Sequence, residues 1–161
     1  MDGTSTNFSC MKRFGCNLDG KGGVYDGSFL YVGYDHKIYF IPDPSHMLKL
    51  ARNALHDYEV FVDADGNEIH WKAIRALYDL QEEELDGIKL GNKLSSRHIF
   101  FQRQKMKVKY AAQTLSSSVA AALETLRKDD DPSFRGTEGT IKFIRVVDRL
   151  FDLLNSRNKY E

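Results

Sequence analysis

The sequence predicts a mainly α-helical fold of the α+β class, with a small N-terminal β portion and one β-hairpin. Two observations support this fold class. Apolar residues recur at helical spacing through the second half of the chain, while β-prone runs are short and lie in the first half. The chain has 161 residues, of which 42% are hydrophobic and 29% charged. This length and composition suit a single globular domain with one core.

The N-terminal segment, residues 1–36, is rich in Gly, Asn, Ser and Tyr and has little periodicity. We therefore expect a short turn or the start of a helix there, followed by a long loop. The β-prone run Lys37–Ile41 predicts a strand that Pro42 ends. A helix then begins, because Asp43 can cap it and Pro44 suits the first helical position. Its apolar stripe consists of Leu48, Ala51 and Leu55.

A β-hairpin is predicted where two β-prone runs, residues 58–62 and 67–71, flank Asp65-Gly66. A calcium-binding EF-hand loop is disfavoured there, because such a loop has its glycine two positions later and helices on both sides. The next helix runs into the acidic residues 82–84. Its apolar face is formed by Trp71, Ile74, Leu77 and Tyr78.

The remaining chain predicts two more helices. One long helix carries an apolar face formed by Val108, Ala111, Leu115, Val119, Ala122 and Leu126. The run Asp129–Pro132 breaks this helix, because proline cannot continue it. The last helix carries Ile141, Ile144, Val147, Phe151 and Leu154.

Simple patterns disfavour several functional classes. The chain has no Gly-x4-Gly-Lys-Ser/Thr sequence, so it has no P-loop. Cys10 and Cys16 lack a second pair to complete a zinc ligand set, and we expect them to be reduced thiols. No apolar run approaches the ~20 residues that span a bilayer. The polar N-terminus lacks a signal peptide, so we expect an intracellular protein, nuclear or cytoplasmic, that is neither secreted nor bound to a membrane.

The start of the helix after Pro44 is a candidate anion site. Helix N-termini present unpaired N–H groups and a positive dipole end, and Lys49 and Arg52 lie within the next two turns. In the alternative, Asp43 is only a helix cap that contributes about 1 kcal/mol, and both basic residues are solvated.

The pair Asn92-Lys93 is of the kind that recognises guanine when an Asp stands two positions after the Lys. Here Ser95 stands at that position. A turn followed by a helix cap at Ser95 or Ser96 therefore explains the pair equally well.

A basic segment follows between residues 97 and 109, with no acidic residue in it. Net charge is zero, since 23 basic residues balance 23 acidic ones, so nucleic-acid binding would need such a local patch. The segment could follow a phosphate backbone, or it could be a solvated helix face balanced by residues 82–84. Its cations are Arg97, Arg103, Lys105, Lys107 and Lys109, with Phe100 and Phe101 among them.

Five groups of residues stand in one order along nearly the whole chain. They are residues 2–7 (DGTSTN); 43–49 (DPSHMLK) with Arg52-Asn53; Asn92-Lys93-Leu94 with His98; 105–109 (KMKVK) continued by 111–116 (AAQTLS); and 151–157 (FDLLNSR). Together they resemble the P-element transposase family and its THAP-domain relatives.

The resemblance implies a function. In this family an RNase H-like fold holds three carboxylates that bind two divalent metals for DNA cleavage and strand transfer. A helical insertion domain binds GTP as a structural cofactor that helps to position DNA. The resemblance implies that Asp2 is a catalytic, metal-binding carboxylate and that Asp43 and Lys49 contact the nucleotide. It implies further contacts from Asn92 and from Asp148 or Asp152.

On this map, residues 1–20 are a remnant of the catalytic core, residues 21–157 the insertion domain and residues 158–161 a tail. The rest of the catalytic triad has no match, since Glu161 is a poor candidate. We therefore expect the chain alone to be inactive, with Mg²⁺ bound only in a complete core. Its expected partners are a guanine nucleotide and, in a full-length protein, transposon-end DNA. It could also be an oligomer.

Two alternatives to this function stay open. The first is a helical interaction or DNA-contact remnant that does not bind nucleotide. The second is an active metal-dependent nuclease.

Overall fold

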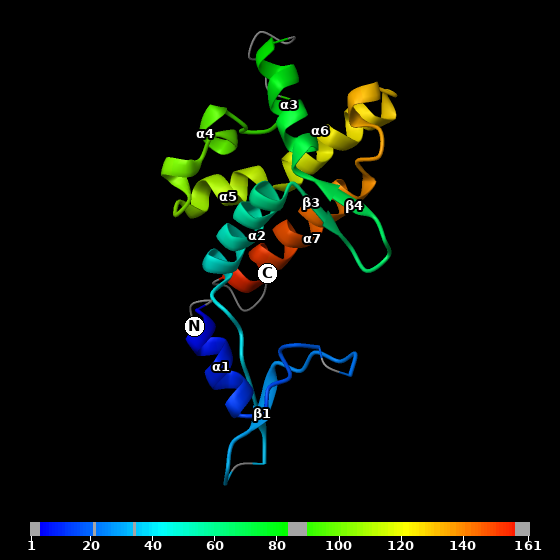
Figure 1. Cartoon of the computed structure of the whole chain (residues 1–161). Coiled ribbons are helices and arrows are strands. Elements are labelled where there is room, and N and C mark those ends of the chain that lie inside the picture. Colours follow the sequence, from blue (N-terminus) through cyan, green and yellow to red (C-terminus); the bar gives the residue numbers. More distant parts are fainter. Residues whose placement is uncertain (1–3, 21, 34, 84–89, 157–161) are drawn as a thin grey trace. The chain divides into compact units, whose positions relative to one another are not determined.

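The computed structural model describes residues 4–20, 22–33, 35–83 and 90–156. The chain divides into two compact units, residues 1–47 and residues 48–161, whereas its length predicted a single domain. The fold is mainly helical, with two small antiparallel β-hairpins, so the predicted fold class is confirmed (Figure 1).

The first unit contains helix α1 (Ser5–Arg13) and a hairpin of strands β1 (Ser28–Leu30) and β2 (Lys37–Tyr39). The predicted helix start and the predicted strand are both confirmed. The prediction of a long loop before that strand is wrong at β1. This strand of three residues pairs antiparallel with β2, and the Phe29 ring stacks on that of Phe14 with their centroids 5.0 Å apart.

The predicted helix and hairpin that follow are both observed. Helix α2 spans Pro44–Tyr58, and strands β3 (Val60–Val62) and β4 (Glu68–His70) pair antiparallel. The Asp63 carboxylate organises the turn between the strands. Its Oδ1 accepts hydrogen bonds from the backbone N of Asp65 at 2.9 Å and of Asn67 at 2.8 Å.

The rest of the second unit is helical. Its α-helices and 3-10 helices are α3 (Trp71–Glu83), α4 (Ser96–Ile99), η1 (Gln102–Gln104), α5 (Val108–Thr114), α6 (Ser117–Lys128), η2 (Pro132–Phe134) and α7 (Glu138–Asn155). Helix α6 packs against α3 and α7, and α7 also packs against β4. The helix predicted to start at Trp71 is α3, and the helix predicted to contain Ile141 to Leu154 is α7.

The prediction of one long helix from Val108 to Leu126 is wrong, because the chain leaves the helix at Leu115 and Ser116 and starts again as α6. Hydroxyl groups compete for the backbone at this point. Thr114 Oγ1 donates to the carbonyl oxygen of Tyr110 at 2.7 Å, and Ser116 Oγ donates to that of Gln113 at 3.0 Å. Apolar residues of the predicted face are still buried on both sides of the break, Ala111 and Leu115 before Ser116 and Val119 and Ala122 after it.

The hydrophobic core lies in the second unit. Its fully buried side chains include Leu55, Ile74, Leu77, Leu115, Val119, Leu123 and Ile144. They come from α2, α3, α6, α7 and the α5–α6 junction, so the core fixes these helices together. Among the residues described here, no helix is long and apolar enough to cross a membrane.

Candidate functional site

The start of α2 carries the first two candidate nucleotide contacts. Asp43 Oδ2 accepts a hydrogen bond from the backbone N of His46 at 2.9 Å, so Asp43 caps the helix as predicted. Pro44 is the first helical residue, also as predicted. Lys49 lies in the second turn and is half-buried. Within the described part of the chain no hydrogen bond or ion pair occupies its ammonium group, which is therefore available to an anionic ligand.

Arg52 is fully buried, so the alternative that it is solvated is wrong. Its guanidinium carbon lies 3.7 Å from the centroid of the Phe101 ring. Its Nη2 donates to the carbonyl oxygen of Lys105 at 3.1 Å, and its Nε donates to Asn53 Oδ1 at 2.8 Å. The buried Nη1 has no hydrogen-bond partner among the described residues. Burial lowers the pKa of Arg52 to about 10.

Asn92 is buried and holds a turn before α4. Its Oδ1 accepts a hydrogen bond from the backbone N of Leu94 at 3.0 Å. Ser95 is the N-cap of α4, and its backbone N donates to Nδ1 of His98 at 3.0 Å. The predicted turn and cap are therefore confirmed, and the Asn92 side chain has a structural role of its own.

Asp148 and Asp152 lie one turn apart on α7. Asp148 Oδ2 accepts a hydrogen bond from the backbone N of Ser117 at 2.9 Å and a second one from the Ser117 hydroxyl. Ser117 is the first residue of α6, so Asp148 satisfies a free N–H group at the start of that helix. Asp152 is exposed and, among the described residues, forms no hydrogen bond or ion pair.

Three of the five candidate DNA-contact cations gather around Tyr110, on α5. Arg97 hydrogen-bonds to the phenol, and this bond is the largest cause of a lowered Tyr110 pKa. The charges of Arg97, Lys107 and Lys109 lower the pKa of the phenol further. Lys107 Nζ lies 5.9 Å from the centroid of the Tyr110 ring. These side chains form a local basic cluster on a chain whose net charge is zero.

The other two cations differ from one another. Arg103, in η1, is exposed and forms no ion pair or hydrogen bond with the rest of the described chain. Lys105 Nζ lies 3.6 Å from Asp57 Oδ2. The alternative of one solvated helix face is wrong, because the segment consists of α4, η1 and the first residues of α5. The acidic residue that pairs with Lys105 is Asp57 and not one of the predicted residues 82–84. Of those three, Glu84 lies outside the described residues.

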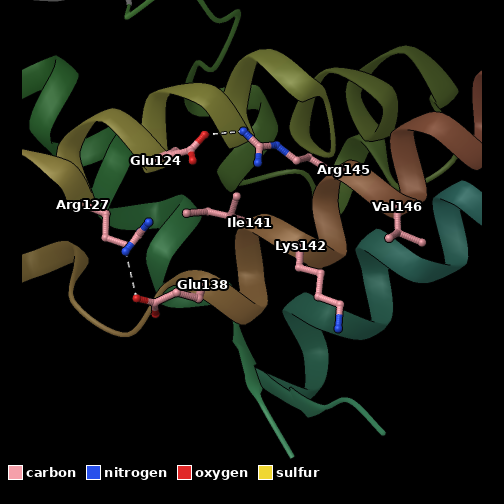
Figure 2. A pocket seen from close by; sticks show the side chains of 7 residues that line it. All are labelled: Glu124, Arg127, Glu138, Ile141, Lys142, Arg145 and Val146. Atoms are coloured by element: carbon pink, nitrogen blue, oxygen red, sulfur yellow. Dashed lines mark hydrogen bonds and ion pairs between the residues drawn. The ribbon is translucent and has the colours of Figure 1, made fainter. Parts of the chain in front are cut away.

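A groove of about 320 Å³ runs between α6 and α7 (Figure 2). Its charged side chains are largely neutralised within the protein. Glu124 pairs with Arg145, and Arg127 Nη1 lies 3.1 Å from Glu138 Oε1. Lys142 Nζ lies 2.7 Å from Asp65 Oδ2. None of the candidate contacts predicted from sequence lines this groove, and its internal ion pairs indicate a structural role.

Asp2, the candidate catalytic and metal-binding residue, lies outside the described residues, as do Arg157 and Glu161. In the described part of the chain, no group of three or more His, Cys, Asp and Glu side chains could hold a metal ion. Cys10 and Cys16 are free thiols, the first exposed and the second buried.

Two features of the site were missed in the sequence. Arg52 occupies the apolar stripe of α2, between Leu48 and Leu55, and this spacing could have indicated its burial. Tyr110 directly follows the cations at 107 and 109, but the predicted basic segment ended before it and included Phe100 and Phe101 as its aromatic residues. Phe101 is fully buried in the core, whereas Phe100 is exposed.

A family model and a relative in Homo sapiens show the family of this chain, and a solved structure shares its fold. The family model described as "TNP-like, GTP-binding insertion domain" matches residues 45–161. The chain is 33% identical over 159 residues to the protein of Homo sapiens named "DNA transposase THAP9", a match that covers 99% of this chain and 17% of that protein. A chain of the solved "Drosophila P element transposase strand transfer complex" has a similar fold, with a TM-score of 0.73 and 22% identity. That match covers 98% of this chain and 35% of the other. The chain therefore spans much less than two thirds of either relative.

Proposed function

The chain belongs to the TNP-like, GTP-binding insertion domain family, and from this premise we propose that it binds a guanine nucleotide and helps to position DNA in a transposase. The family match over residues 45–161 carries the nucleotide half of the proposal. That range includes Lys49, Asn92, Asp148 and Asp152.

Lys49 is the strongest candidate contact for the nucleotide. It lies in the second turn of α2, next to the helix start, where free N–H groups and the helix dipole favour an anion. Its ammonium group has no ion pair or hydrogen bond within the described chain, so an ionic contact with a phosphate would replace only water. Asp43, at the same helix start, keeps one carboxylate oxygen free of the bond to His46. Asp152, on the exposed side of α7, likewise forms no hydrogen bond or ion pair with the described residues.

The basic segment supports the DNA half of the proposal. Arg97, Lys107 and Lys109 cluster around Tyr110, and Arg103 is exposed beside them in the chain. Such a group can neutralise several phosphates without any net charge on the whole chain. Tyr110 can add a hydroxyl donor to phosphate or an aromatic surface for a base.

We further propose that this chain does not cleave DNA alone. Residues 1–20 would be the edge of an RNase H-like core, residues 21–157 the insertion domain and residues 158–161 a tail. Asp2 would complete a metal-binding triad with carboxylates from the rest of a longer protein, and Mg²⁺ would bind only there. Action on transposon ends would place such a protein in the nucleus.

The rival function is a helical DNA-contact or interaction domain without nucleotide binding. One observation favours it. Asp43, Asn92 and Asp148 all use side-chain oxygens to hold backbone N–H groups of their own protein. Such residues can be retained for the fold alone.

Thermal unfolding with and without GTP tests the proposal. Ligand at 100 times its dissociation constant adds about 2.7 kcal/mol to the free energy of unfolding. For a chain of this size, that corresponds to a rise in Tm of roughly 5–10 °C. ATP at the same concentration controls for the base. Lys49→Ala tests the site, and Lys72→Ala, which removes an exposed lysine of α3, is its matched control.

We expect a shift with GTP that ATP does not match, that Lys49→Ala removes and that Lys72→Ala keeps. A cooperative unfolding transition that GTP leaves unchanged would reject nucleotide binding and support the rival function.

A further inference from the structure

Helix α2 and the chain segment 101–107 are joined by a set of contacts between residues far apart in the sequence. The Arg52 guanidinium stacks on Phe101 at 3.7 Å, and its Nη2 donates to the carbonyl oxygen of Lys105 at 3.1 Å. The His56 ring packs edge-on against the Phe101 ring with a centroid distance of 4.8 Å. Asp57 Oδ2 lies 3.6 Å from Lys105 Nζ. One helix face therefore holds the segment by both main chain and side chains.

The segment has little regular structure to hold it otherwise. It contains the short 3-10 helix η1, where Gln104 N donates to Phe101 O at 2.6 Å, and a following turn, where Lys107 N donates to Gln104 O at 3.0 Å. Phe101 is its one fully buried residue, whereas Arg103 and Lys107 are exposed. The position of these two cations therefore depends on what holds Phe101 and Lys105.

Arg52 is suited to transmit a change because its own hydrogen bonding is incomplete. The described residues offer its guanidinium no carboxylate, and its buried Nη1 has no partner. A buried donor of this kind gains from any rearrangement that brings it an acceptor. Arg52 also lies three residues after Lys49, so the two side chains are neighbours on α2.

From this arrangement we propose that Arg52 is a positioning residue that links the nucleotide contact at Lys49 to the basic segment 101–107. A nucleotide that binds the Lys49 side chain shifts α2, and the contacts of Arg52 transmit this shift to Lys105 and Phe101. The inference rests on the proposed nucleotide binding. It adds a route by which the nucleotide alters the presentation of Arg103 and Lys107 to DNA.

Hydrogen exchange of the backbone amides of residues 101–107, with and without GTP, tests this link. The variant is Arg52→Met, which keeps an unbranched apolar stem but lacks the guanidinium and cannot donate to the Lys105 carbonyl. Arg52→Lys retains a donor without the planar stack on Phe101. Arg75→Met, on the exposed side of α3, is the matched control. Thermal unfolding of each protein reports nucleotide binding independently of exchange.

We expect GTP to change the exchange rates of this segment by about 5-fold or more in the wild-type chain, the size of a typical allosteric coupling. Arg52→Met should abolish this response while its thermal shift with GTP persists. Arg52→Lys should restore part of the response, and Arg75→Met should leave it intact. A purely structural Arg52 would instead raise exchange equally with and without GTP.

Two results in the wild-type chain would also overturn the proposal, and they are distinguishable. If GTP gives no thermal shift in the wild-type chain, nucleotide binding fails and this link fails with it. If GTP binds but the exchange of residues 101–107 does not respond, the link alone fails. The wild-type exchange experiment decides this even if Arg52→Met does not fold.

Discussion

Helix α7 passes β4 so closely that a Cβ atom on Gly139 would lie 2.4 Å from the carbonyl oxygen of Glu68. The next residue of the helix, Thr140, accepts a hydrogen bond at its Oγ1 from the backbone N of His70 at 2.9 Å. These two contacts hold the β3–β4 hairpin against the start of α7 (Figure 1). Because α7 also carries Asp148 and Asp152, the same contacts help to set where these candidate nucleotide ligands lie.

Replacement of Gly139 by alanine tests this close approach. In an ordinary helix the change would stabilise by about 0.5–1 kcal/mol. Here the added methyl group would have to push the Glu68 backbone aside, so we expect a net loss of about 1–3 kcal/mol. This corresponds to a fall in Tm of roughly 2–12 °C in thermal unfolding. Arg149→Ala, on the exposed side of the same helix, should change stability by less than about 0.5 kcal/mol. A higher Tm for Gly139→Ala would contradict the packing.

Asp148 should stabilise α6 from its place on α7. Asp148→Ala removes the acceptor for the Ser117 backbone N, and we expect a loss of about 1 kcal/mol in urea unfolding, as for other helix caps. Asp148→Asn keeps an acceptor oxygen and should lose clearly less. Asp152→Ala is the control on the next turn. If Asp148→Ala unfolds like the wild-type chain, the helix-capping role is wrong.

The Asp63 turn should make stability depend on acid. Hydrogen bonds from the side chain and the backbone N of Asn67 are the largest causes of a lowered Asp63 pKa. A carboxyl group of this kind stabilises the fold above its unfolded pKa of about 3.9. That stabilisation is lost as the pH falls through the lower, folded pKa. We therefore expect the free energy of unfolding to drop as the pH falls below about 5.

Urea unfolding of the wild-type chain and of Asp63→Asn across this pH range isolates the contribution of the carboxyl group. The amide keeps an acceptor oxygen but does not titrate, so its free energy of unfolding should fall less steeply with acid. If the free energy of unfolding falls equally steeply with pH in the variant and in the wild-type chain, Asp63 has the same pKa in the folded and unfolded states.

Elements with local signals were predictable from the sequence, and elements that depend on tertiary partners were not. Helix α2 follows from the Asp43-Pro44 start, and the β3–β4 hairpin follows from Asp65-Gly66. Strand β1 is an exception, because the run of residues 28–32 between Gly27 and Gly33 is β-prone and could have indicated it. The break between α5 and α6 is stabilised by Asp148, which lies 31 residues from Ser117.

The candidate site shows the same division. The motif at Asp43 and Lys49 could be located from its spacing at a helix start. The burial of Arg52 depends on Phe101 and Lys105, which approach it only in the folded chain. The five cations of the basic segment could be found by composition, but their different surroundings could not.

Those different surroundings predict unequal contributions to DNA binding. Arg103 is exposed and forms no ion pair with the described residues, whereas Lys105 is paired with Asp57 at 3.6 Å. Each cation that neutralises a phosphate adds about 1 to the slope of log affinity against log salt concentration. We therefore expect Arg103→Gln to reduce this slope by about 1 and Lys105→Gln to reduce it by clearly less. Fluorescence anisotropy of a labelled DNA duplex between about 50 and 200 mM salt measures both. Lys128→Gln, which removes a paired lysine of α6, is the control. Equal losses for Arg103→Gln and Lys105→Gln would mean that DNA displaces Asp57 from Lys105, and no loss for either would place the DNA contact elsewhere.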